Sequence, residues 1–241
     1  MIEGVKSSDV ITVLSKIPQE ARDEVLEVTL DMSNSMDKSI RGSFPNAAIV
    51  TDRFHVQQIV TEAVQEIRIR LRKKAIEAEN KAILLARAKK KSYQPHCYEN
   101  GDTKKQLLAR SRYLLFKPSS KWTESQQVRA TILFREFPEI QHAYNLSMAF
   151  RSWYENSTGR QQALEGLRHW YTKAEAENIE SFTVAAESVK AYEETILNYF
   201  NNRSTNASAE SFNAKLKGFR ALVRGVRDVK FFCFRIAKLY G

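Results

Sequence analysis

The first clear pattern along the chain is an alternation of hydrophobic and polar residues in EVLEVTLD, residues 24–31. A period of two with many β-branched residues is typical of a strand, and this one ends at Asp31. SNSMDKSIRG follows and predicts a short helix capped by Ser33 or Asn34. A second apolar run, AAIVTD at residues 47–52, predicts another strand, which ends at Asp52.

Strand, helix and strand in this order predict a parallel βαβ unit, because residues 32–46 suffice for a crossover that contains a helix. Parallel strands end at the same edge of a sheet, and open α/β sheets place their ligands at that edge. We therefore expect Asp31 and Asp52 to share one edge. Upstream, residues 7–24 have the pattern of a single helix.

From His55 onward the hydrophobic period is helical. Residues 56–91 predict one long helix without proline or glycine, which turns hydrophobic residues inward and Arg68, Arg70, Arg72, Lys73 and Lys74 outward. Further helices are expected over residues 104–116, 123–137, 138–154, 159–174 and 180–200, the second of them opened by a capping box from Thr123 to Gln126. The tryptophans and the FFCF run at residues 231–234 are interpreted as core, with stacking on an unpaired base as the alternative.

Charge is distributed unevenly along the chain. The 241 residues carry a net charge of +10, arranged as −4 over residues 1–64, +11 over 65–130, −4 over 131–202 and +7 over 203–241. Two basic blocks in such a chain favour a polyanionic partner, with nucleic acid first, although a basic solvated helix face is the simpler explanation of each block.

Other classes of protein are disfavoured. The two cysteines and four histidines have no zinc-finger spacing. No run approaches the ~18 apolar residues of a membrane span, and the amino terminus lacks the pattern of a secretion signal. We therefore expect a reduced, cytoplasmic protein without a membrane partner.

Glu210 is the one acid that opens the basic carboxyl-terminal segment. Glu210, Asn213, Lys217, Arg220 and Arg224 recur at spacings of three and four, so that they share one flank of a helix. A plain contact of Glu210 with the positive end of this helix is the structural explanation. The alternative is that Glu210 joins the two strand-end aspartates while the cations behind it follow a phosphate backbone.

Clustered carboxylates beside a basic surface suit phosphodiester chemistry. A pair of hard magnesium or manganese ions takes oxygen ligands, activates a water or a sugar hydroxyl and stabilises the leaving oxygen of an in-line attack. The sequence has no Walker loop and no nucleophile-elbow motif that would indicate another chemistry.

Three stretches carry a resemblance to a known family: VTLDMSNSM, FPNAAIVTDRFHV and STNASAESFNAKLKGFRALVRGVRD. Over practically its whole length the chain resembles the transposases of bacterial insertion sequences of the ISL-three family, and within it the ISAon-type elements. The resemblance implies a DDE transposase with an RNase H-like core, in which two aspartates and a glutamate bind magnesium, and a helical insertion precedes the glutamate.

Transferred by residue, the resemblance makes Asp31 the second acid of the triad and Glu210 the third. Asp52 and His55, in DRFH, match a motif of accessory residues near the metals, as does Asn213. Asp52 in place of Asp31 is an open alternative for the second acid, and a purely structural histidine at a helix start is the alternative for His55.

The DNA-binding residues expected on this basis are cations of the two basic blocks. They are Lys215, Lys217, Arg220, Arg224, Arg68, Arg72, Lys89 and Lys90. Double-stranded DNA is the implied partner, and a homo-oligomer is implied by the resemblance.

The fold class expected is therefore α/β and mostly helical. Residues 1–64 would form a partial RNase H-like core that lacks its first strands, residues 65–200 the all-α insertion, and residues 201–241 the core helices with Glu210. Nothing before Asp31 matches the family's first aspartate. We therefore expect a truncated and poorly active transposase, with a DNA-binding protein without catalysis, or a metal-dependent nuclease, as alternatives.

Overall fold

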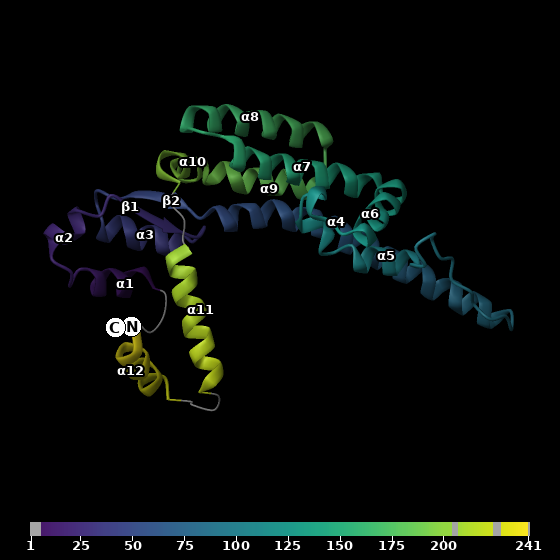
Figure 1. Cartoon of the computed structure of the whole chain (residues 1–241), viewed down its shortest axis with the longest axis horizontal. Coiled ribbons are helices and arrows are strands. Elements are labelled where there is room, and N and C mark those ends of the chain that lie inside the picture. The colour runs from purple at the N-terminus through teal and green to yellow at the C-terminus, as the bar shows by residue number, and fades with distance from the viewer. Residues whose placement is uncertain (1–5, 204–206, 224–227, 241) are drawn as a thin grey trace. The chain divides into compact units, whose positions relative to one another are not determined.

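The computed structural model of the protein describes residues 6–203, 207–223 and 228–240, without the side chains of residues 207, 208 and 210. Most of these residues are helical, and the described strands form one two-stranded sheet (Figure 1). The longer elements, in chain order, are α1 (Ser7–Leu14), α2 (Gln19–Asp23), β1 (Glu27–Leu30), α3 (Asn34–Ser43), β2 (Ala48–Thr51), α4 (Arg53–Ala88), α5 (Lys104–Arg110), α6 (Glu124–Glu136), α7 (Pro138–Asn156), α8 (Arg160–Glu177), α9 (Glu180–Ala191), α10 (Glu193–Asn202), α11 (Ala207–Leu222) and α12 (Val229–Tyr240).

The chain divides into two compact units. The first unit consists of residues 1–53 and 194–241, and the second of residues 54–193. The sheet therefore belongs to the first unit together with the carboxyl-terminal helices. The second unit is built by helices from α4 to α9.

The first unit contains the predicted βαβ element. β1 and β2 pair in parallel, and α3 is the crossover between them. The predicted cap of this helix is confirmed, because the hydroxyl of Ser33 accepts a hydrogen bond from the backbone N–H of Met36 at 3.4 Å. The mostly helical α/β class is thus confirmed, whereas an RNase H-like core stays a prediction.

The second unit buries an aromatic and aliphatic core. α7 packs between α6 and α8, as the contacts between these helices and Figure 1 show. The capping box predicted at the start of α6 is present, with Thr123 and Gln126 each bonded to the other's backbone N–H. α4 begins as a core helix and ends as an exposed one, since its last buried residue is Ala75. None of the helices in the described ranges combines the length and the hydropathy needed to cross a bilayer.

Three predicted helices are divided in the structure. Residues 7–24 form α1 and α2, because Pro18 disfavours a helical conformation at the residue before it and opens the second helix. The helix expected over residues 104–116 ends at Arg110, and a short 3-10 turn, Leu114–Phe116, follows. The helix expected over residues 180–200 breaks at Tyr192, which separates α9 from α10.

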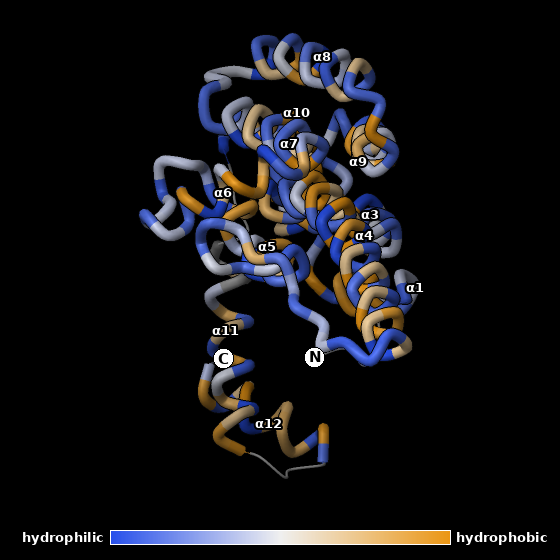
Figure 2. The backbone as a smooth tube through the Cα atoms, turned by 90° about the vertical axis from the view of Figure 1, so that its right-hand side faces the viewer, coloured by the Kyte–Doolittle hydropathy of each residue, from blue (hydrophilic) through white to orange (hydrophobic). Residues whose placement is uncertain are grey.

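The core interpretation of the FFCF run is wrong for its outer residues. Figure 2 shows hydrophobic positions along α12, and in this helix Phe231 and Phe234 are 50% and 60% exposed. Phe232 stacks on Phe219 of α11, with the ring centroids 5.7 Å apart. The hydrophobic residues of α12 therefore pack against one helix, α11, rather than in a buried core.

Candidate active site at the strand ends

The two strands end side by side, and each is followed by an aspartate. In the parallel register Leu30 pairs with Thr51, so that Asp31 and Asp52 come one step beyond the last pair. The backbone N–H of Asp52 donates to the carbonyl of Leu30 at 2.8 Å, which continues the ladder to this point. Neighbouring strands lie about 4.8 Å apart, so the backbones of the two acids meet at one edge of the sheet.

The environments of these two acids differ. Asp31 is exposed, and its carbonyl accepts a hydrogen bond from the N–H of Ser33 at 2.8 Å in the turn that leads into α3. Asp52 is only 5% exposed and stands directly before α4. This is the N-cap position, where aspartate is favoured because its carboxylate can accept from the first free N–H groups of the helix. Asp52 therefore has a structural role open to it that Asp31 lacks.

The accessory residues predicted next to these acids lie on helices. His55 is in the first turn of α4, half-buried, and its ring meets that of Phe54 edge-on with the centroids 5.7 Å apart. Asn213 is exposed on α11. Glu210 belongs to the first turn of α11, but its side chain lies outside the described residues.

In the described part of the chain, the backbone brings two aspartates, Asp31 and Asp52, to the ends of adjacent strands. Within the part of the chain that the structure describes, no group of three or more His, Cys, Asp or Glu side chains is arranged to hold a metal ion. Carboxylate oxygens are nevertheless the donors that magnesium and manganese prefer. Asp31 and Asp52 thus fit a hard divalent cation in chemistry, and a third donor has to come from outside this set.

The predicted cations of α11 are displayed to solvent. Lys215, Lys217 and Arg220 are all exposed, and the last two are three residues apart on one flank of the helix. Arg224 lies outside the described residues. The described part of this flank therefore offers positive charge to an anionic partner.

Arg68 was predicted to face outward, and this is wrong. Its side chain is 6% exposed, and it donates from Nε to Gln65 at 2.7 Å and from Nη1 to the carbonyl of Leu108 at 3.0 Å. Burial lowers the pKa of Arg68 from its usual value, and the nearby charges of Arg112 and Arg72 lower it further. Arg68 therefore joins α4 to α5 and is removed from the expected DNA-binding residues.

The other predicted cations of α4 remain accessible. Arg72, Lys89 and Lys90 are exposed, and the last two stand just past the carboxyl end of the helix. Lys90 has a left-handed backbone with φ of 54°, which is where a helix commonly ends. Leu84 and Leu85 of the same segment are also exposed.

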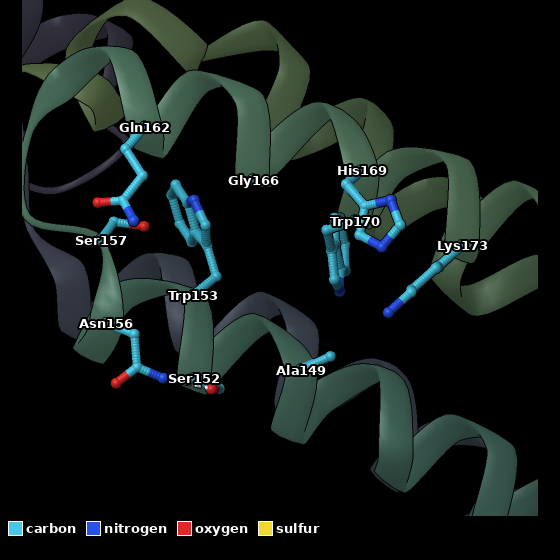
Figure 3. A pocket seen from close by; sticks show the side chains of 10 residues that line it. All are labelled: Ala149, Ser152, Trp153, Asn156, Ser157, Gln162, Gly166, His169, Trp170 and Lys173. Atoms are coloured by element: carbon cyan, nitrogen blue, oxygen red, sulfur yellow. Dashed lines mark hydrogen bonds between the residues drawn. The ribbon is translucent and has the colours of Figure 1, made fainter.

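A cavity of about 270 Å³ lies elsewhere, between α7 and α8. It is lined by Trp153 and Trp170 together with polar residues that include Gln162, His169 and Lys173 (Figure 3). The indole N–H of Trp153 donates to the carbonyl of Ala163 at 2.8 Å, and the ring is 7% exposed. The core interpretation of these two tryptophans is confirmed, because Trp153 is 7% exposed and Trp170 is 2% exposed.

The hydrogen-bonding residues of α10 were missed by the sequence analysis. Thr195, Asn198 and Asn202 contact residues of the sheet, at spacings of three and four that place them on one side of the helix. That polar spacing is visible in the sequence, but Thr195 and Asn198 fell within one helix predicted over residues 180–200 and Asn202 fell beyond it.

Comparison with known proteins identifies relatives of the whole chain. A family model described as a transposase, of the ISL3 group, matches residues 1–236. A transposase for insertion sequence element IS1001 from Bordetella parapertussis is 24% identical over 224 residues. The match covers 92% of this chain and 49% of that protein, so the chain spans about half the length of the curated relative it matches. No solved structure gives a significant match.

Proposed function

This chain belongs to the ISL3 family of transposases, and we propose that it takes part in metal-dependent cleavage and transfer of DNA strands at the ends of an insertion sequence. The observation that carries the proposal is the parallel strand pair in which Leu30 and Thr51 are each followed by an aspartate. Two carboxylates at one sheet edge are what an RNase H-like DDE centre requires of this segment.

The proposal assigns the second acid of the centre to Asp31, the third to Glu210, and an accessory role to Asp52. Together these carboxylates would hold magnesium or manganese. When bound, the ions supply an activated hydroxyl and neutralise the charge that develops on the leaving oxygen. The chain's own contribution is to hold the carboxylates at a fixed sheet edge; no residue of this chain is assigned to the first acid.

Chain length permits Glu210 to reach this edge. Asn202, at the end of α10, bonds to Glu27 at the amino end of β1, and the strands carry their aspartates about 13 Å away at the other end. The four residue steps from Arg203 to Ala207 span at most about 14 Å. This connection is therefore long enough for the first turn of α11 to return to the strand ends.

Positive charge on α11 supports a DNA partner for the same unit. Lys217 and Arg220 follow Glu210 in the helix, so a DNA strand at the metals would continue along these cations. Contacts of this kind are independent of base sequence and weaken as salt rises. Transposition requires two DNA ends to be held together, and the proposal therefore includes a homo-oligomer.

The direct test is calorimetric titration of the whole chain with Mn²⁺, compared with Asp31→Ala and Glu210→Ala. Loss of Mn²⁺ binding in both variants would support one shared site. The matched control is Glu187→Ala, which removes an exposed acid of α9 and is expected to bind like the unmodified chain. Binding that survives both site substitutions would overturn the assignment of Asp31 and Glu210.

A DNA-binding role without catalysis is the second candidate. It is favoured by the burial of Asp52 directly before α4, a position where aspartate is preferred for helix capping without any metal. The two candidates are separated by incubating the chain with Mn²⁺, supercoiled plasmid and labelled duplex. Salt-dependent binding of the labelled duplex, without nicking or joining of DNA strands, would favour this role. Nicking of the plasmid without end specificity would indicate a metal-dependent nuclease.

A further inference from the structure

One side of α10 is devoted to polar contacts with the two strands. The hydroxyls of Thr195 and Thr51 are 2.7 Å apart, the amide of Asn198 donates to the carbonyl of Ile49 at 2.9 Å, and the amide of Asn202 donates to the carboxylate of Glu27 at 3.0 Å. All of these residues belong to the first unit. The sheet is therefore tied to α10 at both of its ends.

The contact at Ile49 provides a hydrogen-bond donor for a backbone carbonyl that has no partner within the described sheet. Ala48 and Asp52 donate their N–H groups to β1, so the alternate residue Ile49 directs its carbonyl to the outer edge of β2. A buried carbonyl without a partner is costly, and Ile49 is buried. The amide of Asn198 takes the place that the N–H of a further strand would have.

The spacing along the helix matches the spacing along the strands. From Thr195 to Asn202 the helix rises about 10 Å, and from Thr51 back to Ala48, the register partner of Glu27, the strand also covers about 10 Å. The helix consequently runs antiparallel to β2 with Thr195 at the carboxyl end of the strand. Thr51, its partner, is buried and immediately precedes Asp52.

We propose that Thr195 and Asn198 are positioning residues that set the place of Asp52, and through the strand register that of Asp31, for divalent-metal binding. This inference rests on the proposed function, since the metal is what the two acids would hold. Neither residue would touch the metal or DNA. Each fixes β2, and β2 carries Asp52 directly after Thr51 and pairs with the strand that carries Asp31.

Packing alone does not require these polar groups. Ile196, Leu197, Tyr199 and Phe200 are the buried residues of α10 and supply its hydrophobic contacts. The polar side instead fixes the position of the helix along the strand, because a hydrogen bond is directional and a hydrophobic contact is not. Removing it should therefore loosen the placement of the acids, in addition to the stability lost with the hydrogen bonds.

The test uses the whole chain with two substitutions of similar size, Thr195→Val and Asn198→Leu. We expect the Mn²⁺ affinity of each to fall roughly tenfold, as when the outer partners of a metal ligand are removed. Amide hydrogen exchange over residues 48–52 should become faster. Thr195→Ser keeps the hydroxyl and should retain the Mn²⁺ affinity, and Thr183→Val, on an exposed side of α9, is the matched control.

The outcomes separate this inference from the function on which it rests. If the unmodified chain binds Mn²⁺ and both variants bind it equally well, the positioning role is wrong while the metal site stands. If Thr195→Ser loses affinity like Thr195→Val, the hydroxyl is not the cause and the role is also wrong. Failure of the unmodified chain to bind Mn²⁺ overturns the proposed function and the positioning role together.

Discussion

Gly166 of α8 lies against the ring of Trp153, and replacing it by alanine tests the packing of α7 on α8. A β-carbon at this position would stand 2.7 Å from Cδ1 and 3.1 Å from Nε1 of the indole. Carbon atoms in contact are about 3.5–4.0 Å apart, so the new methyl group overlaps the ring by roughly 1 Å. Retreat of the ring is resisted because its N–H is bonded to Ala163 and Phe150 lies 5.1 Å away between centroids, although Trp153 and Gly166 also line the cavity between α7 and α8.

Two opposing effects decide the sign of the change. Alanine is preferred over glycine inside a helix by about 1 kcal/mol, whereas overpacking a filled core costs about 1–3 kcal/mol. We therefore expect Gly166→Ala to lower the free energy of unfolding by about 1 kcal/mol. In a body of this size that corresponds to a fall in Tm of about 3 °C.

Urea unfolding followed by tryptophan fluorescence is the suitable assay, because all three tryptophans of the chain belong to the second unit. Two variants serve as controls. Gly218→Ala in α11 meets no atom within 4 Å and should raise the helical signal in far-UV circular dichroism. In a Trp153→Phe background the smaller ring should relieve the overlap, so that alanine at 166 becomes neutral or stabilising. An unfolding midpoint of Gly166→Ala at or above that of the unmodified chain would refute the packing described for α7 and α8.

Three other consequences can be measured. Arg68→Met should make the chain less stable by about 1–3 kcal/mol in urea, because the carbonyl of Leu108 loses its donor, while its affinity for duplex DNA should not change in fluorescence anisotropy. Burial would raise the pKa of Asp102, but hydrogen bonds from Arg129 and Arg110 outweigh it and hold the pKa below its usual value. The stability from Asp102 is therefore full above about pH 4 and is lost as pH falls through the lowered pKa, and the urea midpoint of Asp102→Asn should lack this acid-dependent fall. Changing Lys217 and Arg220 together to glutamine should reduce the slope of log affinity for duplex DNA against log salt by about two, and an unchanged slope would remove both from the interface.

Short-range signals in the sequence predicted the part of the fold that local chemistry controls. Thr123 was correctly identified as a helix cap, and Ser33 is one of the two caps predicted for α3, because a cap depends on residues only three positions apart. The parallel pairing of β1 and β2 was also correct, since a crossover of this length permits few alternatives. The same reasoning correctly placed Asp31 and Asp52 directly after the two strands.

Long-range packing explains what the sequence did not predict. The helical period of α4 places Arg68 among outward residues, but α5 supplies the carbonyl of Leu108 that lets this guanidinium be buried. Phe231 and Phe234 have the spacing of core residues, yet a two-helix contact between α11 and α12 buries only part of that face. Neither outcome follows from the residues of one helix, because each depends on which partner packs against it.

The strand ends show why the placement of a site can depend on residues that bear none of its chemistry. The described sheet has only two short parallel strands, and a parallel ladder is slightly weaker per residue than an antiparallel one. The backbone alone therefore holds Asp31 and Asp52 with few hydrogen bonds. Asn198 adds a bond to the outer edge of β2 and Thr195 adds one at its last residue, so the register of the strand that carries Asp52 is fixed from both edges. If carboxylates at this edge bind metal, their affinity should depend on α10 although none of its residues is a ligand.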